Sequence, residues 1–305
     1  MKVKIVDRIV ELIRDTSSSL PEDVLKAIRS AFRKEARGKS AAVVLKTILD
    51  NCALAKREST PLCQDTGTLA FYIDESLKRK VTPAVIKQAV AIATERGYLR
   101  KNCIDSVTGM SYDDNCCDGA PVVHYVREMM NEKCGMRNGG TVTLLMKGGG
   151  SENMSRQYSL PDSSLGAGRD LEGVRKCILD AVVKAQGFGC APGILGVCIG
   201  GDRATAYEVA KEQLLRPLGS GKDSASPVGG VGLAGDAESL PLRKLEKRIL
   251  KEANSLGIGP MGLGGKTTLL GVKIASRPRV PASFFVTVAY MCWACRRRTI
   301  VVRGS

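Results

Sequence analysis

The sequence predicts an α/β fold in which mixed sheets are flanked by helices and preceded by an N-terminal helical segment. Up to about residue 55, apolar residues recur at helical spacing, whereas from residue 60 short apolar runs alternate with glycines and with further helical stretches. The strands and helices form no clean βαβ repeat, so we expect mixed rather than all-parallel sheets. We therefore divide the chain into a helical segment, residues 1–55, and an α/β domain, residues 56–305.

The N-terminal segment is predicted to contain two or three helices. Ile5, Ile9 and Leu12 recur at helical spacing in a charged stretch, Pro21 stands where a second helix begins, and Ile48 continues the pattern. The opening residues are too charged for a signal sequence, and no apolar run reaches the roughly 18 residues that span a bilayer. We therefore expect a soluble, cytoplasmic protein that has no membrane span.

The second part of the chain is predicted to alternate strands with helices. Apolar runs bounded by turn residues predict strands at residues 68–74, 121–126, 141–146, 193–199 and 283–290. Helical spacing predicts helices at residues 83–96, 171–186, 204–215 and 240–256. Residues 219–235, which are rich in glycine and serine, are predicted to form a surface loop, and residues 128–140 are a candidate for a seam within the domain.

The charge of the chain favours acidic partners without identifying them. Its 46 Lys and Arg residues exceed its 31 Asp and Glu residues, which gives a formal charge of +15. Nucleic acid, an acidic protein and a small anionic ligand are all compatible with this charge. Only 4% of the residues are aromatic, so the side chains on which bases could stack are scarce. A nucleic-acid-binding module is therefore a distant alternative.

The cysteine content points to iron–sulfur chemistry. The chain has 11 cysteines and one histidine, and its only CxxC pair is Cys292 with Cys295. This pattern is unlike a secreted disulfide scaffold and unlike a zinc site. Thiolates without histidine favour a cluster whose ligands come from distant loops. A thiol redox sensor is a second distant alternative, and it would require an exposed cysteine of low pKa.

Four glycine-rich loops at strand ends are predicted to share a site. They are TPLCQDTG at residues 60–67, MKGGGSENMS at 146–155, GFGCAPGILGVCIGGDR at 187–203 and GIGPMGLGGKTT at 257–268. Glycine lets the backbone approach a ligand and present N–H groups to an anion. Any one of these loops could be a simple tight turn. Together they favour one site built from several loops.

These loops, with NCALAKRESTPLCQDTG and ASFFVTVAYMCWA, resemble those of a known family. From about residue 51 to the end, the chain is similar to the alpha subunit or N-terminal half of class I, iron–sulfur-dependent fumarate hydratases and L(+)-tartrate dehydratases. The resemblance implies a [4Fe–4S] cluster held by three cysteines, with the fourth iron left open as a Lewis acid. Carried over to this chain, the ligands are Cys63, Cys190 and Cys292.

The remaining cysteines are assigned no ligand role. Cys295 competes with Cys292, but the family motif does not require it, so packing is its expected role. Cys116 and Cys117 are adjacent and cannot both reach one iron easily. Small buried residues are expected at the other positions, which are Cys52, Cys103, Cys134, Cys177 and Cys198.

The resemblance also implies the substrate contacts. Gln64 and Asp65 follow the first ligand and are placed to move a proton or to orient a bound hydroxyl group. The alternative for Asp65 is an Asx turn that only caps the next two residues. Arg100 matches an arginine that binds a substrate carboxylate, and Gly149 belongs to a glycine run expected to offer backbone N–H groups. The stretch NCCDGAP, residues 115–121, departs from the family pattern and leaves substrate contacts there open.

The implied activity is the reversible hydration of fumarate to malate, with L(+)-tartrate dehydration as the alternative. The implied substrate is a C4 dicarboxylate. Nothing resembling the family's second half follows Arg298, so the implied partner is a beta subunit or a C-terminal half, in a higher oligomer of alpha and beta. The net positive charge fits an acidic partner and a dianionic substrate.

Overall fold

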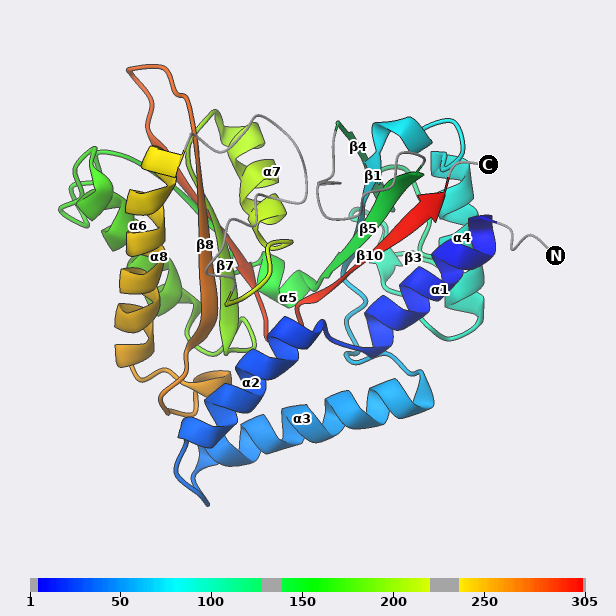
Figure 1. Cartoon of the computed structure of the whole chain (residues 1–305), viewed down its shortest axis with the longest axis horizontal. Helices are drawn as coiled ribbons and strands as arrows, with labels where there is room; N and C mark the ends of the chain where they lie inside the picture. Colours follow the sequence, from blue (N-terminus) through cyan, green and yellow to red (C-terminus); the bar gives the residue numbers. More distant parts are fainter. Residues whose placement is uncertain (1–4, 128–138, 220–235, 304–305) are drawn as a thin grey trace.

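The computed structural model describes residues 5–127, 139–219 and 236–303, and it is built on two four-stranded mixed sheets with helices packed around them (Figure 1). The predicted α/β fold and its N-terminal helical segment are both confirmed. In the view of Figure 1 one sheet lies on each side of the molecule, and α7 (Arg203–Gln213) lies between them.

The N-terminal segment folds into α1 (Ile5–Ser18), α2 (Glu22–Lys34) and α3 (Ser40–Glu58). Pro21 directly precedes α2, where its fixed φ suits the start of a helix. The apolar stripe of α1 is buried from Ile9 to Ile13, because it faces α4 (Pro83–Glu95) and the first sheet. Helices α2 and α3 pack against each other and lie along the bottom of the molecule in the view of Figure 1.

The first sheet has the order β10-β5-β1-β4. These strands are Arg296–Arg303, Gly139–Lys147, Thr68–Asp74 and Val122–Val126. Strand β1 runs parallel to β4 and antiparallel to β5. Its alternate side chains point to opposite faces, so Phe71 packs under α1 and α4 while Tyr72 faces the middle of the molecule. His124 on β4 stacks on Tyr72, with ring centroids 4.9 Å apart.

The second sheet has the order β6-β9-β7-β8. Its strands are Arg156–Ser159, Phe285–Met291, Gly193–Gly200 and Leu269–Arg277. Helices α6 (Leu171–Ala185) and α8 (Asp236–Ser255) cover one face, and α7 covers the other. Both faces are therefore buried, which explains why β7 is apolar along its whole length.

The chain crosses between the two sheets at two places, and both are part of the candidate site. One crossing runs from β5 through the short helix α5 (Gly149–Glu152) to β6, and the other runs from β9 through residues 292–295 to β10. Smaller elements complete the fold: the two-stranded sheet of β2 (Cys103–Ile104) and β3 (Ser111–Tyr112), and the 3₁₀ turns η1 (Glu75–Leu77) and η2 (Pro260–Gly262).

The five predicted strands and four predicted helices all occur, with small shifts of their ends. Strands β2, β3, β6, β8 and β10 were not predicted. The first three are only two to four residues long, β8 follows a glycine-rich loop, and β10 begins with three arginines. The candidate seam near residues 128–140 and the predicted loop at 219–235 fall almost entirely outside the described residues.

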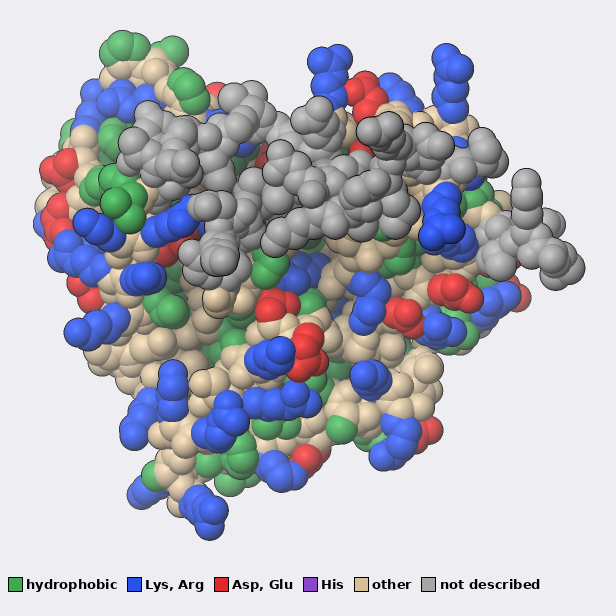
Figure 2. Space-filling model, in the orientation of Figure 1, with side chains coloured by type: hydrophobic (Ala, Val, Ile, Leu, Met, Phe, Trp, Pro, Cys, Tyr) green, Lys and Arg blue, Asp and Glu red, His purple; other side chains and the backbone are tan. Residues whose placement is uncertain are grey.

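On the face drawn in Figure 2 the positive charge is dispersed. Figure 2 shows Lys and Arg side chains spread over the visible face, with Asp and Glu side chains among them. On this face the charge is therefore not gathered into one basic stripe of the kind that tracks a nucleic-acid backbone. In the described parts of the chain, no helix combines the length and the apolar character needed to cross a membrane.

Candidate functional site

The three cysteines predicted as ligands lie at the junction of the two sheets. Cys63 precedes β1, Cys190 precedes β7, and Cys292 follows β9 at a crossing between the sheets. The loops are tied together by the backbone, since the Trp293 N–H donates to the Cys190 carbonyl (3.2 Å) and the Met261 N–H donates to the Ala191 carbonyl (2.9 Å). The topology thus brings together residues that are far apart along the chain.

The thiols influence one another electrostatically. Burial raises the pKa of Cys190, and the neighbouring Cys63 thiol and Asp65 carboxylate raise it further. Burial also raises the pKa of Cys292 to about 12, although the Arg296 guanidinium opposes this shift. A cysteine whose pKa is raised in this way is protonated at neutral pH unless a cation or a metal binds its thiolate.

Two further features of these loops are unusual for ordinary turns. Cys190 has φ +51°, a left-handed conformation that costs a non-glycine residue energy and that concentrates at functional sites. The Asp65 backbone N–H donates to the Cys63 sulfur at 3.5 Å, which is the kind of hydrogen bond that stabilises a thiolate. Both observations fit cysteines that hold a ligand.

The surroundings of Cys292 fit an anionic, sulfur-rich group. The Tyr290 hydroxyl and the Nε and Nη1 atoms of Arg296 are buried without a hydrogen-bond partner in the described structure. A Cβ on Gly189 would lie only 2.4 Å from the Tyr290 ring, so glycine is required there. Among the described residues, no three His, Cys, Asp or Glu side chains could hold a single metal ion. A four-iron cluster does not need three ligands around one ion, because each thiolate binds a different iron.

The other cysteines are placed mostly as predicted. Cys52, Cys177, Cys198 and Cys295 are buried, and the Cys295 thiol faces the Leu214 carbonyl. The prediction was wrong for Cys103, which is only half-buried because it lies in a short surface hairpin, 3.4 Å from the Cys117 sulfur. Cys134 lies outside the described residues.

Asp65 connects the cysteine loop to the glycine-rich crossing. Its Oδ1 accepts a hydrogen bond from the Asn102 amide (3.0 Å), and its Oδ2 accepts one from the Gly150 N–H (3.5 Å). A Cβ on Gly148 would come within 2.9 Å of Oδ2, so a larger residue there would displace the carboxylate from its present position. The carboxylate is therefore held by partners distant in sequence, and it does not form the capping turn considered as an alternative.

Asn115 organises the loop that supports Asp65. Its side-chain oxygen accepts from the backbone N–H groups of Asn102 (2.8 Å) and Cys103 (3.1 Å), and its amide donates to the Arg100 carbonyl (2.9 Å). It is buried and adopts φ +59°. Its amide also donates to the Thr94 hydroxyl (3.0 Å), so all its hydrogen-bonding groups are engaged by the protein. Asn115 therefore positions Asn102 and is not free to bind substrate.

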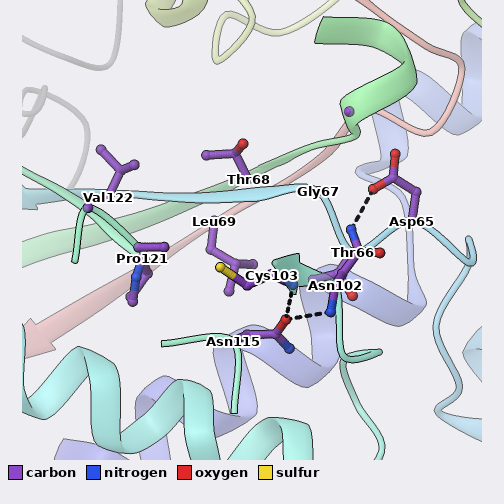
Figure 3. A pocket seen from close by; sticks show the side chains of 13 residues that line it. Asp65, Thr66, Gly67, Thr68, Leu69, Asn102, Cys103, Asn115, Pro121 and Val122 are labelled. Carbon is purple, nitrogen blue, oxygen red and sulfur yellow. Dashed lines mark hydrogen bonds between the residues drawn. The ribbon is translucent and has the colours of Figure 1, made fainter. Parts of the chain in front are cut away.

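A cavity of about 300 Å³ opens beside Asp65 (Figure 3). A space of this size is at the lower end of ordinary ligand sites and is large enough for a four-carbon dicarboxylate. Figure 3 shows Asp65 and Asn102 joined by a hydrogen bond at one end of it and Asn115 below. Its lining includes Asp65, Thr66, Gly67, Thr68, Leu69, Asn102, Cys103, Asn115, Gly119, Ala120, Pro121, Val122 and Gly149.

The other residues predicted to contact substrate are Gly149, Gln64 and Arg100. Gly149 lines the cavity, as a backbone donor should. Gln64 is exposed and its Oε1 accepts a hydrogen bond from the Cys63 thiol at 3.5 Å. Arg100 is not part of the lining: its backbone is tied to Thr66, and its guanidinium is exposed with no partner among the described residues. Lys147, which directly precedes this glycine run, is buried in an ion pair with Glu152 (2.5 Å).

Sequence reasoning missed three residues of this region: Asn102, Tyr290 and Arg296. Asn102 lies two residues from Arg100, in a stretch where the family resemblance points only to the arginine. Tyr290 lies in a predicted strand, and Arg296 opens a run of three arginines. Such a run usually marks a solvated surface, and only the burial of Arg296, which is 1% exposed, reveals its position.

Comparison with known proteins identifies the family. Residues 6–301 match the family model described as fumarate hydratase (Fumerase). A Geobacillus stearothermophilus protein with the provisional name fumarate hydratase class I is 46% identical over 96% of this chain, which spans 54% of that protein. A Methanocaldococcus jannaschii protein, provisionally named an L(+)-tartrate dehydratase alpha subunit, is 33% identical over 97% of this chain and 96% of its own.

A third relative agrees with these two. The L(+)-tartrate dehydratase alpha subunit of Escherichia coli K12 is 28% identical over the whole of this chain and 94% of its own length. The family match covers nearly every described element, including both crossings between the sheets. The chain therefore belongs to the class I fumarate hydratase family, which includes the alpha subunits of L(+)-tartrate dehydratase.

Proposed function

We propose that this chain is the alpha-type half of a hydro-lyase that reversibly hydrates fumarate to malate. The observation that carries the proposal is the position of Asp65, whose carboxylate borders the cavity and whose backbone N–H donates to the Cys63 sulfur. A proton-transfer group next to a metal-ligating thiol is what hydration at an open iron requires. The cellular location that we propose is the cytoplasm.

The site residues divide into those that hold the cluster, those that handle the proton and those that bind substrate. A [4Fe–4S] cluster bound by Cys63, Cys190 and Cys292 would supply a Lewis acid for the substrate hydroxyl and carboxylate. Asp65 holds or moves the proton at its Oδ atoms, with Asn102 fixing the orientation of the carboxylate. Gly149 offers a backbone N–H group to the substrate. Gln64, exposed beside Cys63, offers an amide to the substrate from the open side.

The proposal includes a second half, either a separate beta subunit or a C-terminal domain. This chain spans about half the length of its Geobacillus relative, while the tartrate dehydratase relatives are named alpha subunits. The β2–β3 hairpin next to the cavity exposes Ile104, Val107 and Met110, which are 62%, 93% and 70% exposed. Exposed apolar side chains that rim a cavity are typical of a surface covered by another polypeptide.

The isolated chain should therefore bind the cluster but hydrate fumarate negligibly. Each carboxylate-binding or proton-transfer group supplied by the second half is worth a factor of roughly 10² or more in rate. Fumarate hydration by anaerobically purified chain, alone and after addition of a second-half polypeptide, tests this expectation. Full turnover by the chain alone would refute the need for a partner.

Arg100 should matter for binding once the second half is present. Arg100→Lys keeps the charge but loses the planar fork that holds a carboxylate with two parallel hydrogen bonds. We expect KM for the dicarboxylate to rise by about 10-fold, with the visible spectrum of the cluster unchanged. The matched control is Lys101→Arg, since this neighbour pairs with Asp113 on the surface. An unchanged KM in Arg100→Lys would remove Arg100 from the substrate site.

L(+)-tartrate dehydration is the second candidate. The near full-length matches to tartrate dehydratase alpha subunits favour it, whereas the higher identity to the Geobacillus protein favours fumarate. Both reactions use a C4 dicarboxylate, so the described residues serve either one. The ratio of kcat/KM for fumarate and L(+)-tartrate, measured on the same two-part enzyme, decides between them.

A further inference from the structure

Two cysteines outside the proposed ligand set have their sulfur atoms in contact. The sulfurs of Cys103, on β2, and Cys117, in the loop before β4, lie 3.4 Å apart. Both are free thiols on half-buried side chains. A disulfide bond is about 2.05 Å long, so an approach of roughly 1.4 Å would join the two sulfurs.

The backbone on both sides of this sulfur contact is hydrogen-bonded. The Cys103 N–H donates to the buried side-chain oxygen of Asn115 (3.1 Å), and the Cys117 N–H donates to the Ala120 carbonyl (3.0 Å). Asn115 stands only two residues before Cys117, so the residue that anchors β2 also begins the turn that carries the second cysteine. The two thiols are therefore held opposite each other by the fold around them.

The sulfur pair lies beside the cavity next to Asp65. Cys103 lines that cavity (Figure 3), and so do Gly119 and Ala120, which follow Cys117 closely in the sequence. A bond between the two sulfurs would tie together two segments of the cavity wall. Because both cysteines are only half-buried, a small reagent can reach them.

We propose that Cys103 and Cys117 form a modification site at which a small-molecule disulfide introduces a reversible cross-link in the wall of the cavity. In the first step the Cys117 thiolate attacks one sulfur of the small disulfide, whose S–S bond breaks and releases one small thiol. In the second step the Cys103 thiolate attacks the Cys117 sulfur and releases the second small thiol. Two protein thiols are oxidised, and one disulfide is reduced to two thiols that take up the two protons.

The order of these steps follows from the surroundings of Cys103. Burial and the neighbouring Cys117 thiol raise the pKa of Cys103 to about 11, so little thiolate is present there at neutral pH. Cys103 therefore acts second, within the protein, where its partner is only 3.4 Å away. The raised pKa also distinguishes this pair from a fast thiol sensor, which requires a cysteine of low pKa.

Cys116 provides a matched control. It adjoins Cys117 in the sequence and is also half-buried. Its thiol donates to the carbonyls of Lys87 on α4 (3.4 Å) and Asp114 (3.5 Å). Cys116 is therefore engaged with the backbone and not with Cys103, and its replacement should leave the cross-link unchanged.

The test treats the full chain, purified anaerobically in the reduced state, with 2-hydroxyethyl disulfide and then blocks the remaining thiols. Proteolytic cleavage after Tyr112 separates Cys103 from Cys117, so only a disulfide still joins their two peptides in a mass spectrum recorded without reduction. Wild type and Cys116→Ser should show the joined peptides, and dithiothreitol should separate them. In Cys103→Ser the second step cannot occur, so Cys117 should keep a bound hydroxyethylthio group.

Wild-type peptides that separate without dithiothreitol would overturn the inference. A cross-link that is lost in Cys116→Ser and kept in Cys117→Ser would also overturn it, because the bond would then belong to Cys116. The inference does not depend on the proposed function, since the peptides are identified whether or not the chain holds a cluster. The visible spectrum of the untreated chain tests the cluster separately.

Discussion

Replacement of Asp65 by asparagine should lower kcat for fumarate hydration by roughly 10²-fold or more, measured with the second half present. Asparagine has nearly the same size as aspartate and can still accept a hydrogen bond from Asn102. It cannot take up or deliver a proton at the reacting carbon or hydroxyl. The cluster spectrum and the thermal stability should stay close to wild type, because the backbone bonds from Asp65 to Cys63 and Arg296 remain.

The companion variant Asn102→Ala separates orientation from proton transfer. It removes the amide that holds Oδ1 but leaves the carboxylate, so a smaller loss of kcat is expected than in Asp65→Asn. If Asp65→Asn turns over at nearly the wild-type rate, Asp65 is only a structural support for Cys63. The acid and the base would then both belong to the other half.

The second large effect is expected at Cys292. Cys292→Ser should abolish cluster binding, because a hydroxyl group is a poor ligand for iron in this chemistry and only two thiolates would remain. Iron and sulfide should fall to background in the purified protein, and fumarate hydration should fall with them. Far-UV circular dichroism checks that the variant is folded.

Cys295→Ser is the matched control for this experiment. Cys295 lies three residues after Cys292, is also buried, and its thiol faces the Leu214 carbonyl. Its replacement should cost some stability, since a buried hydroxyl is poorly accommodated, but the cluster should remain. Loss of the cluster in Cys295→Ser with retention in Cys292→Ser would reverse the ligand assignment.

The sequence predicted the parts of the fold that depend on local pattern. The predicted bounds of β1 coincide with the observed Thr68–Asp74, because an apolar run there ends in a turn signal. Helix α7 begins one residue earlier than predicted, because the Asp202 side chain accepts from the N–H groups of Ala204 and Thr205 and starts the helix.

Strand β10 could not be predicted from such patterns. Its arginines suggest a solvated surface. In the structure Arg297 donates to Asp23 and Arg298 donates to Ser19, both in the N-terminal helical segment. These partners come from the other end of the chain, so no window of sequence contains the pair. Tertiary contacts therefore allow charged residues to form a strand that pairs with β5 along eight residues.

The candidate site, like the fold, was only partly predictable from the sequence. The family resemblance supplied Cys63, Asp65 and Cys292, and the glycine-rich loops that carry or adjoin them lie together in the fold. Asn102 was not recognised and the role of Asn115 stayed open, because these residues act through hydrogen bonds to Asp65 and to the backbone of a neighbouring loop. The departure from the family pattern at residues 115–121 leaves this support intact, since Asn115 keeps its backbone contacts.

The central claim is that this chain alone binds a [4Fe–4S] cluster through three cysteines. The most direct measurement is the iron and acid-labile sulfide content of the anaerobically purified or reconstituted chain, together with its visible and EPR spectra. We expect about four iron and four sulfide ions per chain, and a broad visible absorption band that bleaches on reduction. A colourless chain that binds neither iron nor sulfide after anaerobic reconstitution would contradict this claim.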